Sequence, residues 1–203
     1  MVRVILVRHG ETEWNKDKRY QGHHDVALSE VGREQAGKVA RRLRSEKVDA
    51  VYASDLSRAY ETAATIAREH NLAVEKVPGL REVHFGEWEG LSRAEIIEKH
   101  GAVYDRWQEN PLATKLPGGE SAREVQVRAL AALEKIVSDH RAGETVVIVA
   151  HGGAICSILC HYLQCGFWEC LLGNTGFSVL EFGPDGVNVA VRSDAKHLVD
   201  PEE

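Results

Sequence analysis

Short apolar runs rich in β-branched residues recur along the chain and predict strands. The first run is nearly continuous, and the run near residue 145 has the strongest strand pattern. Such runs are typical of strands that are buried on both faces. Near the end of the chain, two runs flank a Gly-Pro-Asp-Gly turn and predict a closing hairpin. The expected strands are Val2–Val7, Ala50–Ala53, Ala73–Val77, Thr145–Ala150, Phe177–Phe182 and Val187–Val191.

Segments with helical periodicity separate these strands. Ser29 is a good N-cap residue, and apolar residues recur at helical spacing after it, from Ala36 to Leu43. Ser121 and Glu124 form a capping box that opens a long helix to about His140. The other helices are expected at Ser57–His70, Ala94–Lys99 and Val103–Gln108. This alternation predicts an α/β fold: a three-layer, doubly wound, mostly parallel sheet with helices on both faces and a closing hairpin at its C-terminal end.

The chain has 203 residues, a length that favours one large domain. We find no repeat and no linker, so residues 1–203 are expected to form a single domain. The stretch at about 83–119 has the least regular pattern. We interpret it as a lid-like segment of that domain rather than as a second domain.

Charge and hydropathy exclude several classes of protein. The formal net charge of −6 argues against a nucleic-acid partner, which requires a basic surface. The only apolar run near the N-terminus, Val4–Val7, is too short for a secretory signal or a membrane span. We therefore expect a cytoplasmic protein with no membrane partner. Whether it forms a homo-oligomer stays open.

The four cysteines lie within fifteen positions of one another, which raises the question of a metal site. They contain no Cys-x-x-Cys pair, and Cys156 and Cys160 lie in an apolar helical run. We interpret all four as structural thiols, because a free cysteine usually behaves as a small buried apolar side chain.

Polar residues follow the expected strands at the point where each strand ends. They are Arg8-His9-Gly10, Ser54 with Arg58, Arg81-Glu82, and His151-Gly152-Gly153. Ligands of open α/β sheets bind outside the carboxyl ends of the strands. One such residue alone is usually a capping or surface residue. Their joint occurrence at successive strand ends predicts a functional site.

The residue types at these strand ends suit phosphoryl transfer. Arginine side chains match phosphate oxygens, and Arg58 is expected near a helix N-terminus, which also favours anions. A neutral imidazole such as that of His9 is a competent nucleophile, and neighbouring guanidinium groups disfavour its protonation. A carboxyl group such as that of Glu82 can protonate the leaving oxygen and then activate water. This chemistry requires no metal and no cofactor.

A longer set of motifs resembles the histidine phosphatase superfamily, which includes the phosphoglycerate mutases. The resemblance extends over nearly the whole chain, and its most specific part is the run from Leu6 to Asn15. The further matching stretches are Gln21-Gly22 with Asp25, Leu28-Ser29, Ser54–Ala59 with Thr62-Ala63, Leu80-Arg81-Glu82, Gly86–Gly90, Gly118–Ser121 and His151-Gly152.

The resemblance implies a role for each matching residue. His9 would be the nucleophile that becomes phosphorylated, and Arg8, Arg58 and His151 would complete the phosphate pocket. Glu82 would be the proton donor. The resemblance adds Asn15, Gln21, Gly22 and Gly152 as contacts to substrate or phosphate. Arg81 has no such role, and we expect it in a surface salt bridge.

The implied activity is hydrolysis of a small phosphorylated metabolite through a phosphohistidine intermediate. The chain resembles broad-specificity, phosphoserine and α-ribazole phosphatases. A cofactor-dependent phosphoglycerate mutase is the alternative. Only 69 positions separate Glu82 from His151, fewer than in the mutases, and Gln21-Gly22 is more typical of the phosphatases. A second alternative is a catalytically silent binding or regulatory module, yet no expected residue is missing.

Several residues near this set have two interpretations. His23 and His24 either touch substrate or belong to a solvated loop, which we favour. Trp88 and Trp107 either line the mouth of the pocket or pack inside the irregular segment. The physiological substrate stays open.

Overall fold

The computed structural model describes residues 1–199 of the protein. A six-stranded mixed sheet forms its centre. The strand order is β3-β2-β4-β1-β5-β6, in which β1, β2, β3 and β4 are parallel and β5 is antiparallel to β1 and β6. The strands are β1 (Val2–Arg8), β2 (Ala50–Ala53), β3 (Val74–Lys76), β4 (Thr145–Ala150), β5 (Phe177–Gly183) and β6 (Gly186–Asp194). The predicted mostly parallel sheet with a closing hairpin is confirmed.

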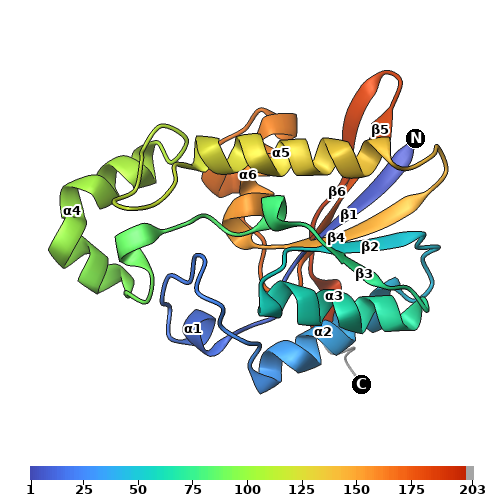
Figure 1. Ribbon diagram of the computed structural model, residues 1–203, viewed down its shortest axis with the longest axis horizontal. Coiled ribbons are helices and arrows are strands. Elements are labelled where there is room, and N and C mark those ends of the chain that lie inside the picture. Colours follow the sequence, from blue (N-terminus) through green and yellow to red (C-terminus); the bar gives the residue numbers. More distant parts are fainter. Residues whose placement is uncertain (200–203) are drawn as a thin grey trace.

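Helices cover both faces of this sheet, which confirms the predicted three layers (Figure 1). The helices are α1 (Glu13–Lys16), α2 (Glu30–Leu43), α3 (Ser57–Glu69), α4 (Arg93–Glu109), α5 (Ala122–Ser138) and α6 (Gly152–Leu163). Four 3-10 turns also occur: η1 (Pro78–Leu80), η2 (Gly86–Trp88), η3 (Phe167–Cys170) and η4 (Lys196–Leu198). Ser29 and Ser121 cap α2 and α5 as expected.

The alternation of side chains along the central strands divides the core between the two faces. In β1, Ile5 and Val7 pack in the cluster with α2 and α3, while Val4 and Leu6 pack in the cluster with α5 and α6. All six residues of β4 are buried, because β4 lies between β1 and β2 and is covered on both sides. This packing holds the strand ends that carry the site.

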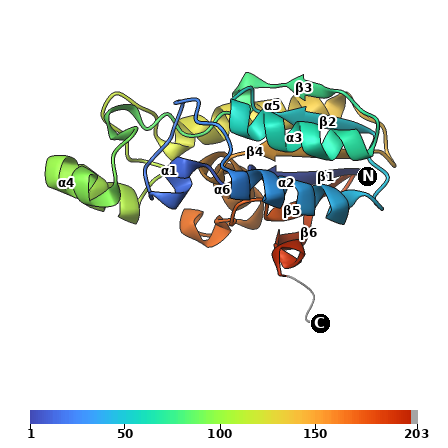
Figure 2. The same cartoon turned by 90° about the horizontal axis from the view of Figure 1, so that it is seen from below.

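The segment at 83–119 is more regular than its pattern predicted. The two short helices expected there form one element, α4, which is interrupted at His100 by non-helical backbone angles (φ −137°, ψ 27°). In Figures 1 and 2, α4 lies at the opposite end of the molecule from the N-terminus. The segment has its own apolar cluster, which includes Trp88, Ile96, Tyr104 and Trp107.

Within residues 1–199, no helix is both long and apolar enough to cross a membrane.

Candidate active site

The carboxyl ends of β1, β2 and β4 lie at one edge of the sheet, and a pocket of about 240 Å³ opens beside them. Eight of the nine residues proposed from the sequence line this pocket: Arg8, His9, Asn15, Gln21, Gly22, Arg58, Glu82 and Gly152. The ninth, His151, lies directly behind, with its ring centroid 5.1 Å from that of His9. The fold therefore brings the whole predicted set together.

His9 follows the last residue of β1, and its ring is buried. The Nδ1 atom lies 2.6 Å from the backbone oxygen of Gly10. A carbonyl oxygen only accepts hydrogen bonds, so Nδ1 carries the proton and Nε2 keeps a free lone pair. Burial, followed by the charges of Arg58 and Arg8, holds the pKa of His9 well below its usual value. His9 is therefore neutral at physiological pH.

Two buried guanidinium groups flank this imidazole. Arg58, in the first turn of α3, donates to the backbone oxygens of Gly22 and His24, each at 2.8 Å. Arg8, at the end of β1, donates to the backbone oxygen of Leu172. The Nε atoms of both arginines lack a hydrogen-bond partner among the described residues. Burial lowers the pKa of Arg58 to about 10, so it stays cationic and can bind an anion.

His151 occupies the N-cap position of α6, directly after β4. Neither ring nitrogen has a hydrogen-bond partner within residues 1–199. Burial and the charge of Arg58 hold its pKa well below the usual value. Because a buried polar atom without a partner is costly, both nitrogens point to a ligand that the site is built to receive.

Glu82 lies between η1 and η2 and faces the first turn of α6. Its Oε1 accepts from the backbone N–H groups of Val83 at 2.9 Å and Ala154 at 3.2 Å, whereas Oε2 accepts from Gly153 at 3.2 Å. These contacts set the position of the carboxyl group in the pocket. Gly153 leaves room for this position of the carboxyl group, because a Cβ atom would lie only 2.6 Å from Oε1.

The polar wall of the pocket is completed by residues after β1. Asn15 accepts a hydrogen bond from the backbone of Thr12 through Oδ1, which leaves its NH₂ group as the donor. The buried Oε1 of Gln21 has no partner among the described residues. Gly22 has a positive φ of 55°, and a Cβ there would overlap the Glu89 carboxyl group. The glycine therefore allows the turn that brings its carbonyl to Arg58.

Some residues that hold this site were missed by the sequence analysis. Asn174 donates to the backbone oxygen of His9 at 3.0 Å. Thr62, which the resemblance included without a role, accepts from the backbone N–H of Gly10 at 3.1 Å. Asn174 stands in a Gly-Asn-Thr-Gly loop before β5, whose amino end lies at the edge where β1 ends. That polar loop before a strand was a usable signal, but the rule that ligands bind at the carboxyl ends of strands does not include it.

Arg128, in α5, was also missed. Its Nη1 atom donates to the backbone oxygens of Gly79 and Arg81, at 2.9 and 2.7 Å, and its Nη2 donates to that of Glu82 at 2.7 Å. Its Nε and Nη2 also donate to the carboxylate of Glu120, at 2.9 and 2.8 Å. Arg128 therefore clamps the backbone that carries Glu82. Main-chain acceptors have no side-chain signature, so the sequence offered no signal for this clamp.

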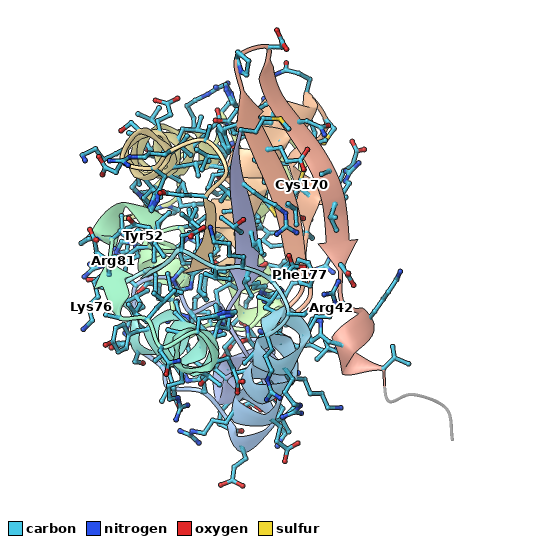
Figure 3. The ribbon with its side chains drawn as sticks, turned by 90° about the vertical axis from the view of Figure 1, so that its right-hand side faces the viewer. Arg42, Tyr52, Lys76, Arg81, Cys170 and Phe177 are labelled. Atoms are coloured by element: carbon cyan, nitrogen blue, oxygen red, sulfur yellow. The ribbon has the colours of Figure 1, made fainter. Side chains whose placement is uncertain are left out.

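The remaining candidates fall outside the polar centre. Arg81 forms the expected salt bridge, with Asp55, and Figure 3 shows it on the same side of the molecule as Lys76. His24 is exposed and pairs with Glu89 at 2.6 Å, outside the pocket lining, as the loop interpretation predicted. For His23 that interpretation was wrong, because its ring is half-buried and its Nε2 donates to the backbone oxygen of Glu82 at 2.9 Å. Trp88 is completely buried, whereas Trp107 both packs in the core and lines the pocket.

No three His, Cys, Asp or Glu side chains in residues 1–199 are grouped to hold a metal ion. The four cysteines are free thiols, and three of them are buried.

Comparisons with known proteins agree with this fold. The family model of the histidine phosphatase superfamily (branch 1) matches residues 4–195. The chain therefore belongs to this superfamily, and it is a phosphatase of small metabolites.

Phosphoserine phosphatase 1 of Hydrogenobacter thermophilus is 39% identical over 183 residues, which cover 89% of this chain and 86% of that protein. The metal-independent phosphoserine phosphatase of Arabidopsis thaliana is 38% identical over 198 residues, covering 96% and 82% of the two chains. The solved structure of Bacillus stearothermophilus YhfR superposes with a TM-score of 0.93 at 32% identity, over 98% of this chain and 100% of that one.

Proposed function

We propose that the protein hydrolyses phosphate monoesters through a covalent phosphohistidine at His9, without a metal ion or a cofactor. The observation that carries this proposal is the state of the His9 ring. Its Nδ1–H is held by Gly10, and the ring lines a pocket in which Arg8 and Arg58 have nitrogens without partners among residues 1–199. His151, whose ring nitrogens also lack partners there, lies next to the His9 ring. This arrangement suits the capture of a phosphoryl group by a nitrogen nucleophile.

In the first half-reaction, the Nε2 lone pair attacks phosphorus as the bond to the leaving oxygen breaks. Protonated Glu82 transfers its proton to that oxygen, so the alcohol departs neutral. We assign the proton to Oε2, because Oε1 already accepts two backbone N–H groups. Arg8, Arg58, Asn15 and the backbone N–H of Gly152 stabilise the charge on the phosphoryl oxygens.

In the second half-reaction, water attacks the phosphohistidine. The Glu82 carboxylate takes one proton from the water, the P–N bond breaks, and inorganic phosphate leaves. The His9 ring returns to its neutral form with the Nδ1 proton still held by Gly10. His151 lies against the His9 ring and offers a nitrogen to the transferred group.

We propose that the segment at 83–119 acts as the specificity-setting lid of a single domain. It supplies Phe85 and Trp107 to the pocket, where they meet Phe167 and Trp168 from the other side. Lys18 lies at the same opening. The aromatic side chains favour a small phosphorylated metabolite with an apolar part. Phosphoserine, which has little apolar surface but is the substrate named for two relatives, is the first compound to compare with such a metabolite.

We also propose a cytoplasmic location. The four free thiols support a reducing compartment.

The test is detection of the phosphoenzyme. Brief exposure to ³²P-labelled phosphomonoester, followed by rapid quenching, should trap a label that is stable in alkali and lost in acid, on a peptide containing His9. The variant His9→Asn should trap no label and show no turnover. The matched control His161→Asn, at the exposed end of α6, should behave as wild type. Turnover by His9→Asn above background would refute the proposal.

A second arm separates hydrolysis from phosphoryl return to substrate. With 3-phosphoglycerate and a bisphosphate primer, the proposed enzyme releases inorganic phosphate, whereas a mutase forms 2-phosphoglycerate. Activity that a chelator abolishes and added metal restores would contradict the metal-free mechanism.

A further inference from the structure

Two thiols lie in contact at the ends of the η3 turn, outside the catalytic set. The sulfur atoms of Cys165 and Cys170 are 3.3 Å apart, although the cysteines are separated by four residues. Cys165 is partly exposed, whereas Cys170 is buried against the β5–β6 side of the molecule (Figure 3). No step of phosphoryl transfer uses either sulfur.

The surroundings of the pair differ for its two members. The Nη2 of Arg192, on β6, lies 3.8 Å from the Cys165 sulfur and also donates to the backbone oxygen of Glu169 at 3.0 Å. This places a positive charge next to the accessible sulfur, a setting typical of reactive cysteines. Burial, together with the contact to Cys165, raises the pKa of Cys170 to about 12. Because Cys165 is the more exposed sulfur of the two, an oxidant reaches it first, and Cys170 is its resolving partner.

Another thiol is close by, but its contacts keep it out of this pair. Cys160 lies in α6, where its sulfur donates to the backbone oxygen of Ser157 and accepts from the Gln126 amide, both at 3.4 Å. Cys170 holds the sulfur contact with Cys165 instead.

The turn between the two cysteines forms part of the catalytic pocket. Phe167 and Trp168 lie inside it and Leu171 follows it, and all three line the pocket. The next residue, Leu172, accepts the hydrogen bond from Arg8 through its backbone oxygen. A change in the backbone between the cysteines therefore reaches both the apolar wall and a phosphate-binding arginine.

We propose that Cys165 and Cys170 form a reversible disulfide, which makes this turn an oxidation site that alters the substrate pocket. The oxidant is a peroxide. The Cys165 sulfur attacks one peroxide oxygen, so an S–O bond forms, the O–O bond breaks and water leaves. The Cys170 sulfur then attacks the Cys165 sulfur, so the S–S bond forms, the S–O bond breaks and a second water leaves. Two thiols lose two electrons, and hydrogen peroxide gains them.

Bond formation must move the pocket wall. A disulfide bond is about 2.05 Å long, so the two sulfurs must approach by about 1.3 Å from their present contact. The Gly166 backbone and the short η3 turn take up this movement, and Phe167 and Trp168 move with it. The bridge itself does not depend on the proposed phosphatase activity; only its effect on turnover does.

The chemical test measures the bridge without activity. The reduced protein is treated with limiting hydrogen peroxide, its remaining thiols are alkylated, and its intact mass and peptides are analysed. We expect the mass of two hydrogen atoms to be lost and a cross-link between Cys165 and Cys170, reversed by dithiothreitol. Cys165→Ser and Cys170→Ser should not form it, whereas the control Cys160→Ser should. Sulfinic acid at Cys165 without a cross-link, or a cross-link to Cys160, would overturn the proposal.

The functional test compares the oxidised and reduced protein as phosphatases. We expect kcat/KM for a bulky phosphomonoester to fall by up to about a hundredfold on oxidation, since a shift near 1 Å in a positioning wall has that effect. Dithiothreitol should restore it, and Cys170→Ser should show no change with peroxide. A mapped bridge with unchanged kcat/KM would refute the link to the pocket. An inactive reduced protein that still forms the bridge would instead refute the proposed phosphatase function.

Discussion

A methyl group at position 153 has no room beside the proposed acid. The Cβ of an alanine there would lie 2.5 Å from Val83 Cγ2 and 2.6 Å from Glu82 Oε1, both closer than carbon and oxygen atoms pack. Val83 is buried, so the movable neighbour is the Glu82 carboxyl group. The variant Gly153→Ala should therefore fold with Glu82 displaced from the amides of α6.

The cost of this change follows from two opposing effects. Overpacking a filled site costs about 1–3 kcal/mol, and replacing a helical glycine with alanine returns up to about 1 kcal/mol. The net loss of about 0–3 kcal/mol lowers the melting temperature by no more than about 12 °C for a domain of this size. General acid catalysis contributes about 10²–10⁴ to the rate, so loss of a correctly placed Glu82 should cost far more in activity than in stability.

The assay compares two leaving groups. We expect kcat for an alkyl phosphate to fall about a hundredfold or more, while p-nitrophenyl phosphate, whose leaving group needs little protonation, loses much less. In a Glu82→Gln background, Gly153→Ala should lower kcat little further, because the residue 82 side chain that it displaces can no longer act as an acid. The matched control is Gly101→Ala in α4, where the new Cβ has no neighbour within 4 Å among the described residues outside the adjacent helix backbone. Equal loss on both substrates, or additive losses in the double variant, would refute this reasoning.

Three further predictions concern the clamp, the pocket mouth and the buried histidines. Arg128→Met removes the donor to three backbone oxygens and the ion-pair partner of Glu120, so we expect about 2 kcal/mol or more of destabilisation and a lower kcat on alkyl phosphates. Trp107→Phe, at the pocket wall, should change the ratio of kcat/KM between substrates but not the rate at which the phosphoenzyme is hydrolysed. The folded-state pKa values of His9 and His151 lie well below 6.5, so only the unfolded chain binds protons at these residues as the pH falls. The free energy of unfolding should therefore drop by about 1 kcal/mol per histidine between about pH 6.5 and 5.5.

Each of these has a control. In urea unfolding, the double variant Arg128→Met/Glu120→Met should regain part of the stability that Arg128→Met loses. No recovery would mean that the Glu120 carboxylate without its arginine is not the cause of that loss. Equal changes for every substrate in Trp107→Phe would remove that residue from specificity. The loss of stability with falling pH should be smaller in His9→Asn and unchanged in His161→Asn. If the free energy of unfolding of His9→Asn changed with pH as in the wild type, His9 would be protonated in the folded state.

The sequence was sufficient for the fold because its signals were local. Continuous β-branched runs in β1 and β4 and the N-caps Ser29 and Ser121 predicted elements that the structure contains. The prediction for α4 was less accurate. Two helical patterns separated by His100 and Gly101 do not reveal whether the helix continues between them. Local periodicity defines a helix but not the kink that joins two of them.

The sequence by itself determined the set of residues at the carboxyl ends of the parallel strands. It could do so because the alternation of strands and helices gives the direction of those strands. Only the tertiary structure decided which groups support that set. Asn174 reaches His9 because β5 runs antiparallel to β1, with Phe177 opposite Val7, so that the beginning of one strand meets the end of the other. Arg128 reaches Glu82 through main-chain oxygens. Contacts of this kind depend on strand order and on helix placement, and no pattern along the chain records them.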